Sequence, residues 1–71
     1  MIEQMETLFL SYFKAGYNFS EAKQKLKQDS PNPGIETKIP FFLIQKYANG
    51  RHISESDWPD FAREIIEKRG L

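Results

Sequence analysis

The chain of 71 residues contains no cysteine and no valine, and it has a single histidine, His52. Without cysteine, neither a disulfide nor a thiolate metal site can form. The lone histidine follows Asn49-Gly50 and leaves no second nitrogen or sulfur ligand for zinc. The sequence therefore predicts no metal and no other cofactor, and we interpret His52 as a surface residue.

Long apolar segments are also absent. The sequence has no run of about 18 consecutive apolar residues, which is the length that a transmembrane helix needs. It opens with MIEQMETLF, which carries two acidic residues and no basic one, unlike the positively charged start of a secretory signal peptide. We therefore expect a cytoplasmic protein that has no membrane partner.

The side-chain groupings that an active site requires are missing as well. The four glycines, at positions 16, 34, 50 and 70, each fall at the end of an expected element, and none belongs to a phosphate-binding loop. The carboxylates are scattered along expected helices, and Asp57 and Asp60 fit the preference for acidic residues near a helix N-terminus. We therefore expect no catalytic residue, no enzyme activity and no small-molecule substrate.

What the sequence does contain is a balance of charges and enough apolar residues to fold. Ten basic and ten acidic residues give a formal net charge of zero, and 39% of the residues are hydrophobic. A chain of this length suits one domain, which we assign to residues 1–71. Seven basic and three acidic residues fall between residues 14 and 52. That modest excess weakly favours nucleic-acid binding and fits an ordinary solvated surface better.

Two helices are expected in the first half of the chain. Apolar residues recur every three or four positions over residues 2–14, and Ala15-Gly16 provides an exit. Asn18 and, three positions later, Glu21 match a capping box, which predicts a second helix over residues 19–28. The polar face of this helix would carry Lys23, Lys25 and Lys27.

The second half of the chain predicts a long loop and two further helices. Two prolines and a glycine in DSPNPGIET indicate a loop over residues 29–37. The third helix is expected over 40–48, because a residue before proline avoids helical geometry and proline suits the first turn. The fourth is expected over 57–68, where apolar residues recur at helical spacing from Trp58, with Ser56 as N-cap. No segment alternates with the period of a strand, so the predicted fold class is all-α, a small four-helix domain.

The segment IPFFLIQKYANGRHISESDWPDFAREI, which begins at Ile39, resembles the lambda-repressor/Cro-type helix-turn-helix family. YANGR, residues 47–51, matches the end of the family's recognition helix, and Phe61-Ala62 followed by Ile65 matches the helix after it. The resemblance implies a helix-turn-helix fold. Its turn would be extended or degenerate, because the connection from about Gln28 to Pro40 is longer than the usual three or four residues.

The resemblance also implies which side of the third helix faces outward. Counted back from Asn49-Gly50, the buried positions fall on Ile39, Ile44 and Tyr47. The outward positions, which face DNA in the family, fall on Pro40, Phe41, Phe42, Gln45 and Lys46. Base readout needs hydrogen-bonding side chains at the helix start, whereas exposed phenylalanines suggest a protein partner. One or both phenylalanines could instead belong to the core.

Three functions follow from this reading. The first is a small transcription-switch protein similar to the antirepressors, or modulators of repression, of temperate phages: its apolar recognition helix would bind a repressor's DNA-binding domain and block DNA binding. The second is a Cro-like or excisionase-like protein that binds DNA directly, with Gln45 and Lys46 at the bases and with backbone contacts from Lys23, Lys25, Lys27, Lys38 and Arg51. The third is a helical interaction domain unrelated to transcription. We favour the first.

Overall fold

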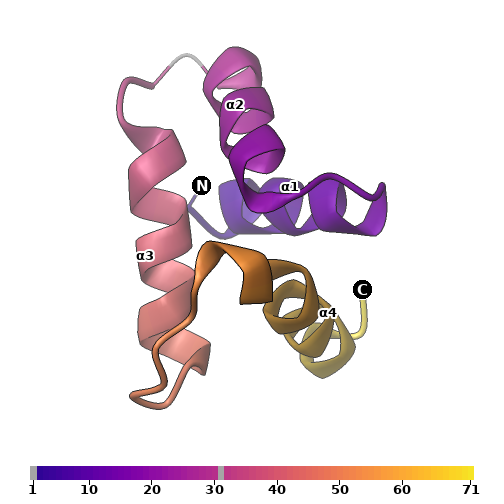
Figure 1. Ribbon diagram of the computed structural model, residues 1–71. Helices are drawn as coiled ribbons and strands as arrows, with labels where there is room; N and C mark the ends of the chain where they lie inside the picture. Colours follow the sequence, from indigo (N-terminus) through magenta and orange to yellow (C-terminus); the bar gives the residue numbers. More distant parts are fainter. Residues whose placement is uncertain (1, 31) are drawn as a thin grey trace.

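A computed structural model describes residues 2–30 and 32–71, and within these residues the chain is all-helical (Figure 1). Met1 lies outside the described residues, as does Pro31, which belongs to the loop predicted over 29–37. The elements follow in the order α1 (Ile2–Lys14), α2 (Phe19–Asp29), α3 (Ile35–Tyr47), the 3₁₀ turn η1 (Glu55–Asp57) and α4 (Trp58–Arg69). The all-α class predicted from the sequence is therefore confirmed.

The first two helices form where local signals place them. Helix α1 ends at Lys14, and Gly16 then takes a φ of 97°, a left-handed conformation that suits glycine. Asn18 caps α2 as predicted: its side chain accepts a hydrogen bond from the Glu21 amide at 2.8 Å. The Glu21 carboxylate in turn accepts from the Asn18 amide at 3.0 Å. The capping box therefore fixes the corner between α1 and α2.

Helix α3 begins at Ile35, so the prediction that it starts near Pro40 is wrong. Pro40 lies inside the helix, where it has no amide hydrogen to offer the carbonyl of Glu36. The turn before it forms nonetheless, because the Gly34 carbonyl accepts hydrogen bonds from the amides of Thr37 and Lys38, each at 3.1 Å. Helical geometry there also buries Ile35. The free energy gained by this burial outweighs the tendency of the residue before a proline to avoid helical backbone angles.

The connection between α2 and α3 is accordingly short. Helix α2 ends at Asp29 and α3 begins at Ile35, so residues 30–34 join them. Gly34 takes a φ of 81° just before α3, and glycine alone adopts this conformation without strain. The loop predicted over residues 29–37 is therefore shorter at both ends. The prediction of an extended connection from Gln28 to Pro40 is wrong. The observed length is close to that of an ordinary helix-turn-helix connection.

Helix α4 follows η1 and spans nearly the predicted residues. Its N-cap residue is Asp57 and not Ser56, and Asp57 itself accepts a hydrogen bond from the Ser54 hydroxyl at 2.8 Å. Pro59 lies in the first turn, where a missing amide hydrogen has no consequence. Gly70 ends the helix with a φ of 71° and donates to the Glu67 carbonyl at 3.2 Å.

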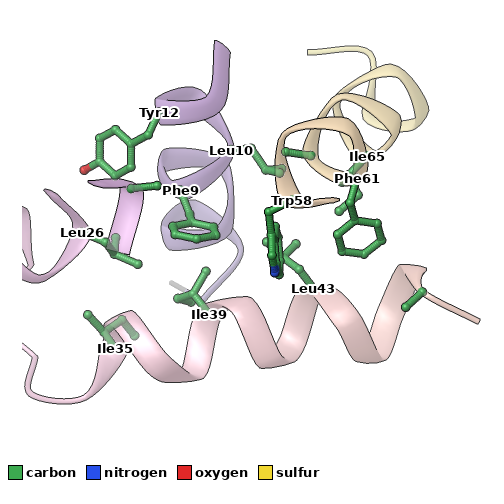
Figure 2. Packing of buried hydrophobic residues seen from close by; sticks show 13 residues of the cluster. Phe9, Leu10, Tyr12, Leu26, Ile35, Ile39, Leu43, Trp58, Phe61 and Ile65 are labelled. Atoms are coloured by element: carbon green, nitrogen blue, oxygen red, sulfur yellow. The ribbon is translucent and has the colours of Figure 1, made fainter. Parts of the chain in front are cut away.

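The four helices enclose one hydrophobic cluster with Trp58 at its centre (Figure 2). The Trp58 ring lies 5.6 Å from the Phe9 ring of α1 and 5.0 Å from the Phe61 ring of α4, both edge to face. On α3, Ile39 and Leu43 are fully buried at one-turn spacing and lie below Phe9 and Trp58 in Figure 2. Helix α1 packs against each of the other three helices, and α2 packs against α3.

Among the described residues, no helix has both the length and the apolar character that crossing a membrane requires.

Candidate interaction surface

Helix α3 turns one side to the core and the opposite side to solvent. Its buried side chains include Ile35, Ile39 and Leu43, which repeat every four residues. Five residues of α3 are exposed: Lys46 and four on the solvent side, to which we refer as the Phe41 face, namely Thr37, Lys38, Phe41 and Gln45. Of the five residues assigned outward from the sequence, Phe41, Gln45 and Lys46 are exposed, whereas Phe42 is half-buried and Pro40 is buried.

Phe41 and Phe42 have different surroundings although they are neighbours in the chain. Phe41 is 56% exposed, more than any other large hydrophobic residue in the described part of the chain. Phe42 is half-buried and packs against the hydrophobic cluster, with its ring 6.2 Å from that of Phe41. The outward assignment thus fits Phe41 and fails for Phe42, which packs against the core.

Two further assignments on this helix need correction. Pro40 was assigned outward and is buried, and Leu43 was not assigned inward although it is fully buried. Ile44, assigned inward, is only half-buried, as is Tyr47. The buried side of α3 is defined by Ile35, Ile39 and Leu43, which are spaced four residues apart. Counting back from Asn49-Gly50 does not give this spacing.

Lys46, which is assigned outward, is exposed and also binds a buried carboxylate. Its ammonium group donates to both oxygens of Glu6, Oε1 at 3.1 Å and Oε2 at 3.0 Å. Glu6 is fully buried on α1, and Nη2 of Arg69 on α4 also donates to its Oε1, at 2.6 Å. Arg69 Nε in turn donates to the Tyr47 hydroxyl at 2.8 Å. We call these four side chains the Glu6 network: Glu6, Lys46, Tyr47 and Arg69.

The environment of Arg69 favours its charged form. Burial lowers the pKa of the guanidinium, and the hydrogen bonds to Glu6 and Tyr47, together with the charges of these groups, raise it by more. The guanidinium also lies over the Tyr47 ring, 5.3 Å from its centroid. The network therefore holds a permanent cation at the end of α4 against the end of α3.

The basic residues predicted to contact a DNA backbone do not share one face. On α2, the ammonium of Lys23 lies 5.6 Å from the centre of the Phe19 ring and that of Lys25 lies 5.2 Å from the centre of the Tyr17 ring, while Lys27 is exposed. Lys38 belongs to the Phe41 face of α3.

The side chain of Arg51 makes contacts within the protein. Its Nε donates to the Ala48 carbonyl at 2.9 Å, and its Nη2 pairs with the Glu64 carboxylate at 3.0 Å. Its guanidinium therefore closes the C-terminal end of α3 and joins it to α4. Arg51 therefore stabilises the fold, and these contacts leave its side chain less free to bind a phosphate.

His52 lies on the surface, on the rim of a shallow groove of about 290 Å³. Charged residues from the end of α3 and from α4 line the groove, among them Arg51, Asp60 and Glu64. Among the described residues, no group of three acidic or histidine side chains comes close enough to hold a metal ion.

The Glu6 network was not predicted from the sequence. One signal was present: Glu6 falls between Met5 and Phe9, on the side of the first helix that the apolar residues define. Its partners, however, lie 40 and 63 positions further along the chain. Nothing in a single sequence indicates that pairing.

We compared the chain with protein-family models, with curated proteins and with solved structures, and none of them matches.

Proposed function

We propose that this chain is a small regulator that works by binding another protein through the Phe41 face, with a repressor's DNA-binding domain as its partner. One observation carries the proposal: Phe41 is 56% exposed at the middle of α3, whereas Phe9 and Phe61 are buried. Aromatic side chains at the centre of a surface are typical anchors of protein interfaces. The choice of a repressor rests on the resemblance of residues 39–66 to the lambda-repressor/Cro-type family.

The surroundings of Phe41 suit an anchor. The Phe41 ring lies 6.2 Å from the ring of Phe42, which packs against the hydrophobic cluster, and this contact limits the freedom that Phe41 would lose on binding. Lys38 and Gln45 flank it at one-turn spacing and supply a polar rim. Burying the phenyl ring in a partner's pocket would contribute about 1.5–3 kcal/mol to binding. Regulation would follow from masking the partner's DNA-reading surface, without any chemistry.

The first test replaces Phe41 by Ser and measures binding to the DNA-binding domain of a repressor from the same genome by calorimetry. We expect the dissociation constant to rise about tenfold to a hundredfold, as for a hot-spot residue. Stability should change by less than about 0.5 kcal/mol because the side chain is exposed. Ile2→Ser is the matched control, since Ile2 is 47% exposed on a different helix. Equal affinity of Phe41→Ser and the unchanged protein would refute the proposal.

The second candidate function is direct DNA binding, and two observations favour it. Lys38 and Gln45 are exposed on the same side of α3, and the connection of residues 30–34 is shorter than the sequence suggested. Fluorescence anisotropy with random duplex DNA at two salt concentrations separates the alternatives. Micromolar binding that weakens steeply with salt and is lost in Lys38→Ala would favour DNA. Binding to neither DNA nor a repressor would leave a helical interaction domain outside transcription.

A further inference from the structure

The last turn of α4 is attached to the molecule differently from the rest of the helix. Its core residues, Trp58, Phe61, Ala62 and Ile65, all lie in the first two and a half turns. After them, Ile66 and Arg69 are half-buried, while Glu67 and Lys68 are exposed. Apart from Ile66, which packs against the hydrophobic cluster, polar contacts hold this end: Arg69 binds Glu6 and Tyr47, and the Leu71 carbonyl accepts from Lys14 at 3.3 Å.

The contacts of Arg69 depend on a single carboxylate. Among the described residues, Glu6 is the one carboxylate that pairs with Arg69, at 2.6 Å, and the Arg69 side chain is only 15% exposed. Its Nη1 atom is buried and has no hydrogen-bond partner. Lys46 shares Glu6 but is half exposed, so water can solvate its ammonium group if the contact is lost. Removing the negative charge of Glu6 would therefore leave Arg69, and not Lys46, as an uncompensated cation away from water.

We propose that Glu6 is a latch that keeps the last turn of α4 closed over Tyr47, and that neutralising it opens this turn while the core stays folded. The open turn would return the Arg69 guanidinium to water. The apolar contacts that it would break are those of Ile66, which is half-buried, because the fully buried core residues of α4 precede it. Opening a helix end costs less free energy than opening a helix centre. Local opening of the last turn is therefore the most favourable way to return the unpaired Arg69 to water.

Opening would change the surface at the C-terminal end of α3. Arg69 covers the Tyr47 ring at 5.3 Å, and Tyr47 is the last residue of α3. When the turn opens, the ring of Tyr47 and the side chain of Ile66 gain exposure, which extends the apolar surface of α3 toward its C-terminal end. The closed turn is thus an internal contact that limits this surface. The latch does not depend on which partner, if any, binds Phe41.

The test compares amide hydrogen exchange, followed by NMR, in the unchanged protein and in Glu6→Gln, which keeps the shape of the side chain and removes its charge. We expect exchange of the amides of residues 66–70 to become about ten- to a hundredfold faster, the effect of losing a hydrogen bond to a charged group. Exchange in α2 should stay within about twofold. The control is Glu67→Gln, which removes a carboxylate from the same turn, where Glu67 is exposed.

Two measurements keep the inference testable if Glu6→Gln does not fold. Arg69→Met leaves Glu6 paired with Lys46 and should speed exchange in the same residues 66–70. In the unchanged protein, exchange of these amides should depend little on low concentrations of denaturant, whereas exchange of Ile65 should depend on it strongly. Faster exchange spread evenly over all four helices, or no change at residues 66–70, would overturn the latch.

Discussion

Glu6 and Tyr12 show how single polar side chains join helices in a chain that has no cysteine. Both lie on the buried side of α1 and reach another element. Glu6 binds cations from α3 and α4, and the Tyr12 hydroxyl donates to Asp29 Oδ2 at 2.6 Å. A buried carboxylate that loses its cations is costly, whereas removing the neutral Tyr12 hydroxyl loses one hydrogen bond and leaves Asp29, which is exposed, to water. Removing the contacts of Glu6 should therefore destabilise the protein more than removing the contact of Tyr12.

The Tyr12–Asp29 contact predicts a loss of stability in strong base. Burial, and then the hydrogen bond and the charge of Asp29, raise the pKa of Tyr12 above its ordinary value of about 10. A group whose pKa is raised by folding stabilises the protein fully below its unfolded pKa, and this contribution declines as the pH rises further. Tyr12→Phe should therefore cost about 1 kcal/mol of unfolding free energy near neutral pH. The difference should shrink above about pH 10.

Urea unfolding of both proteins at a series of pH values measures this difference. Taking the difference removes the lysines and the other tyrosines, which titrate in both proteins. A gap between the two proteins that stays constant through pH 11 would show that Tyr12 does not titrate as described.

At the scale of whole helices, local sequence signals predicted α1, α2 and α4, and for α3 they predicted the C-terminal end but not the start. The capping box of Asn18 and the apolar spacing after Trp58 act within a few residues, so one sequence suffices to read them. Pro40 also acts locally, but burial of Ile35 and Ile39 against other helices decided where α3 begins. The exposed position of Phe41 was predictable from the same helix. The Glu6 network was not, because tertiary packing alone brings its members together.

The capping box of α2 gives a prediction at this scale. Asn18→Ala removes the side-chain oxygen that accepts from the Glu21 amide at 2.8 Å, and we expect a loss of about 1 kcal/mol in unfolding free energy. Thermal or urea unfolding followed by circular dichroism measures it. Ser20→Ala, at an exposed position in the first turn of the same helix, is the control and should change stability by less than about 0.5 kcal/mol. Equal effects of the two substitutions would mean that the capping box does not stabilise α2.

At the scale of the molecule, Trp58 connects the elements. Its ring stacks on Phe13 of α1 at 5.9 Å and on Phe19 of α2 at 5.1 Å, and in Figure 2 it points toward α3 beside Leu43. No helix can leave the cluster without changing the surroundings of this one indole. The single tryptophan therefore reports on the packing of the whole molecule and not on α4 alone.

We expect tryptophan fluorescence and far-ultraviolet circular dichroism to give the same unfolding curve in urea, as in a two-state transition. Fluorescence follows the environment of Trp58, and circular dichroism follows all helices together. Midpoints that differ by more than the experimental error would show that part of the fold unfolds independently. The opening of residues 66–70 proposed above involves too few amides to separate the two curves.

The exposure of Phe41 has a consequence for how this protein behaves in concentrated solution. The formal net charge is zero at pH 7, so long-range repulsion between copies is weak near neutrality. Each copy also exposes the phenyl ring of Phe41 to other copies, and Lys38 is the one lysine on the same face. The side chain that we propose as an interface anchor is thus also expected to limit colloidal stability, and solubility should improve away from neutral pH.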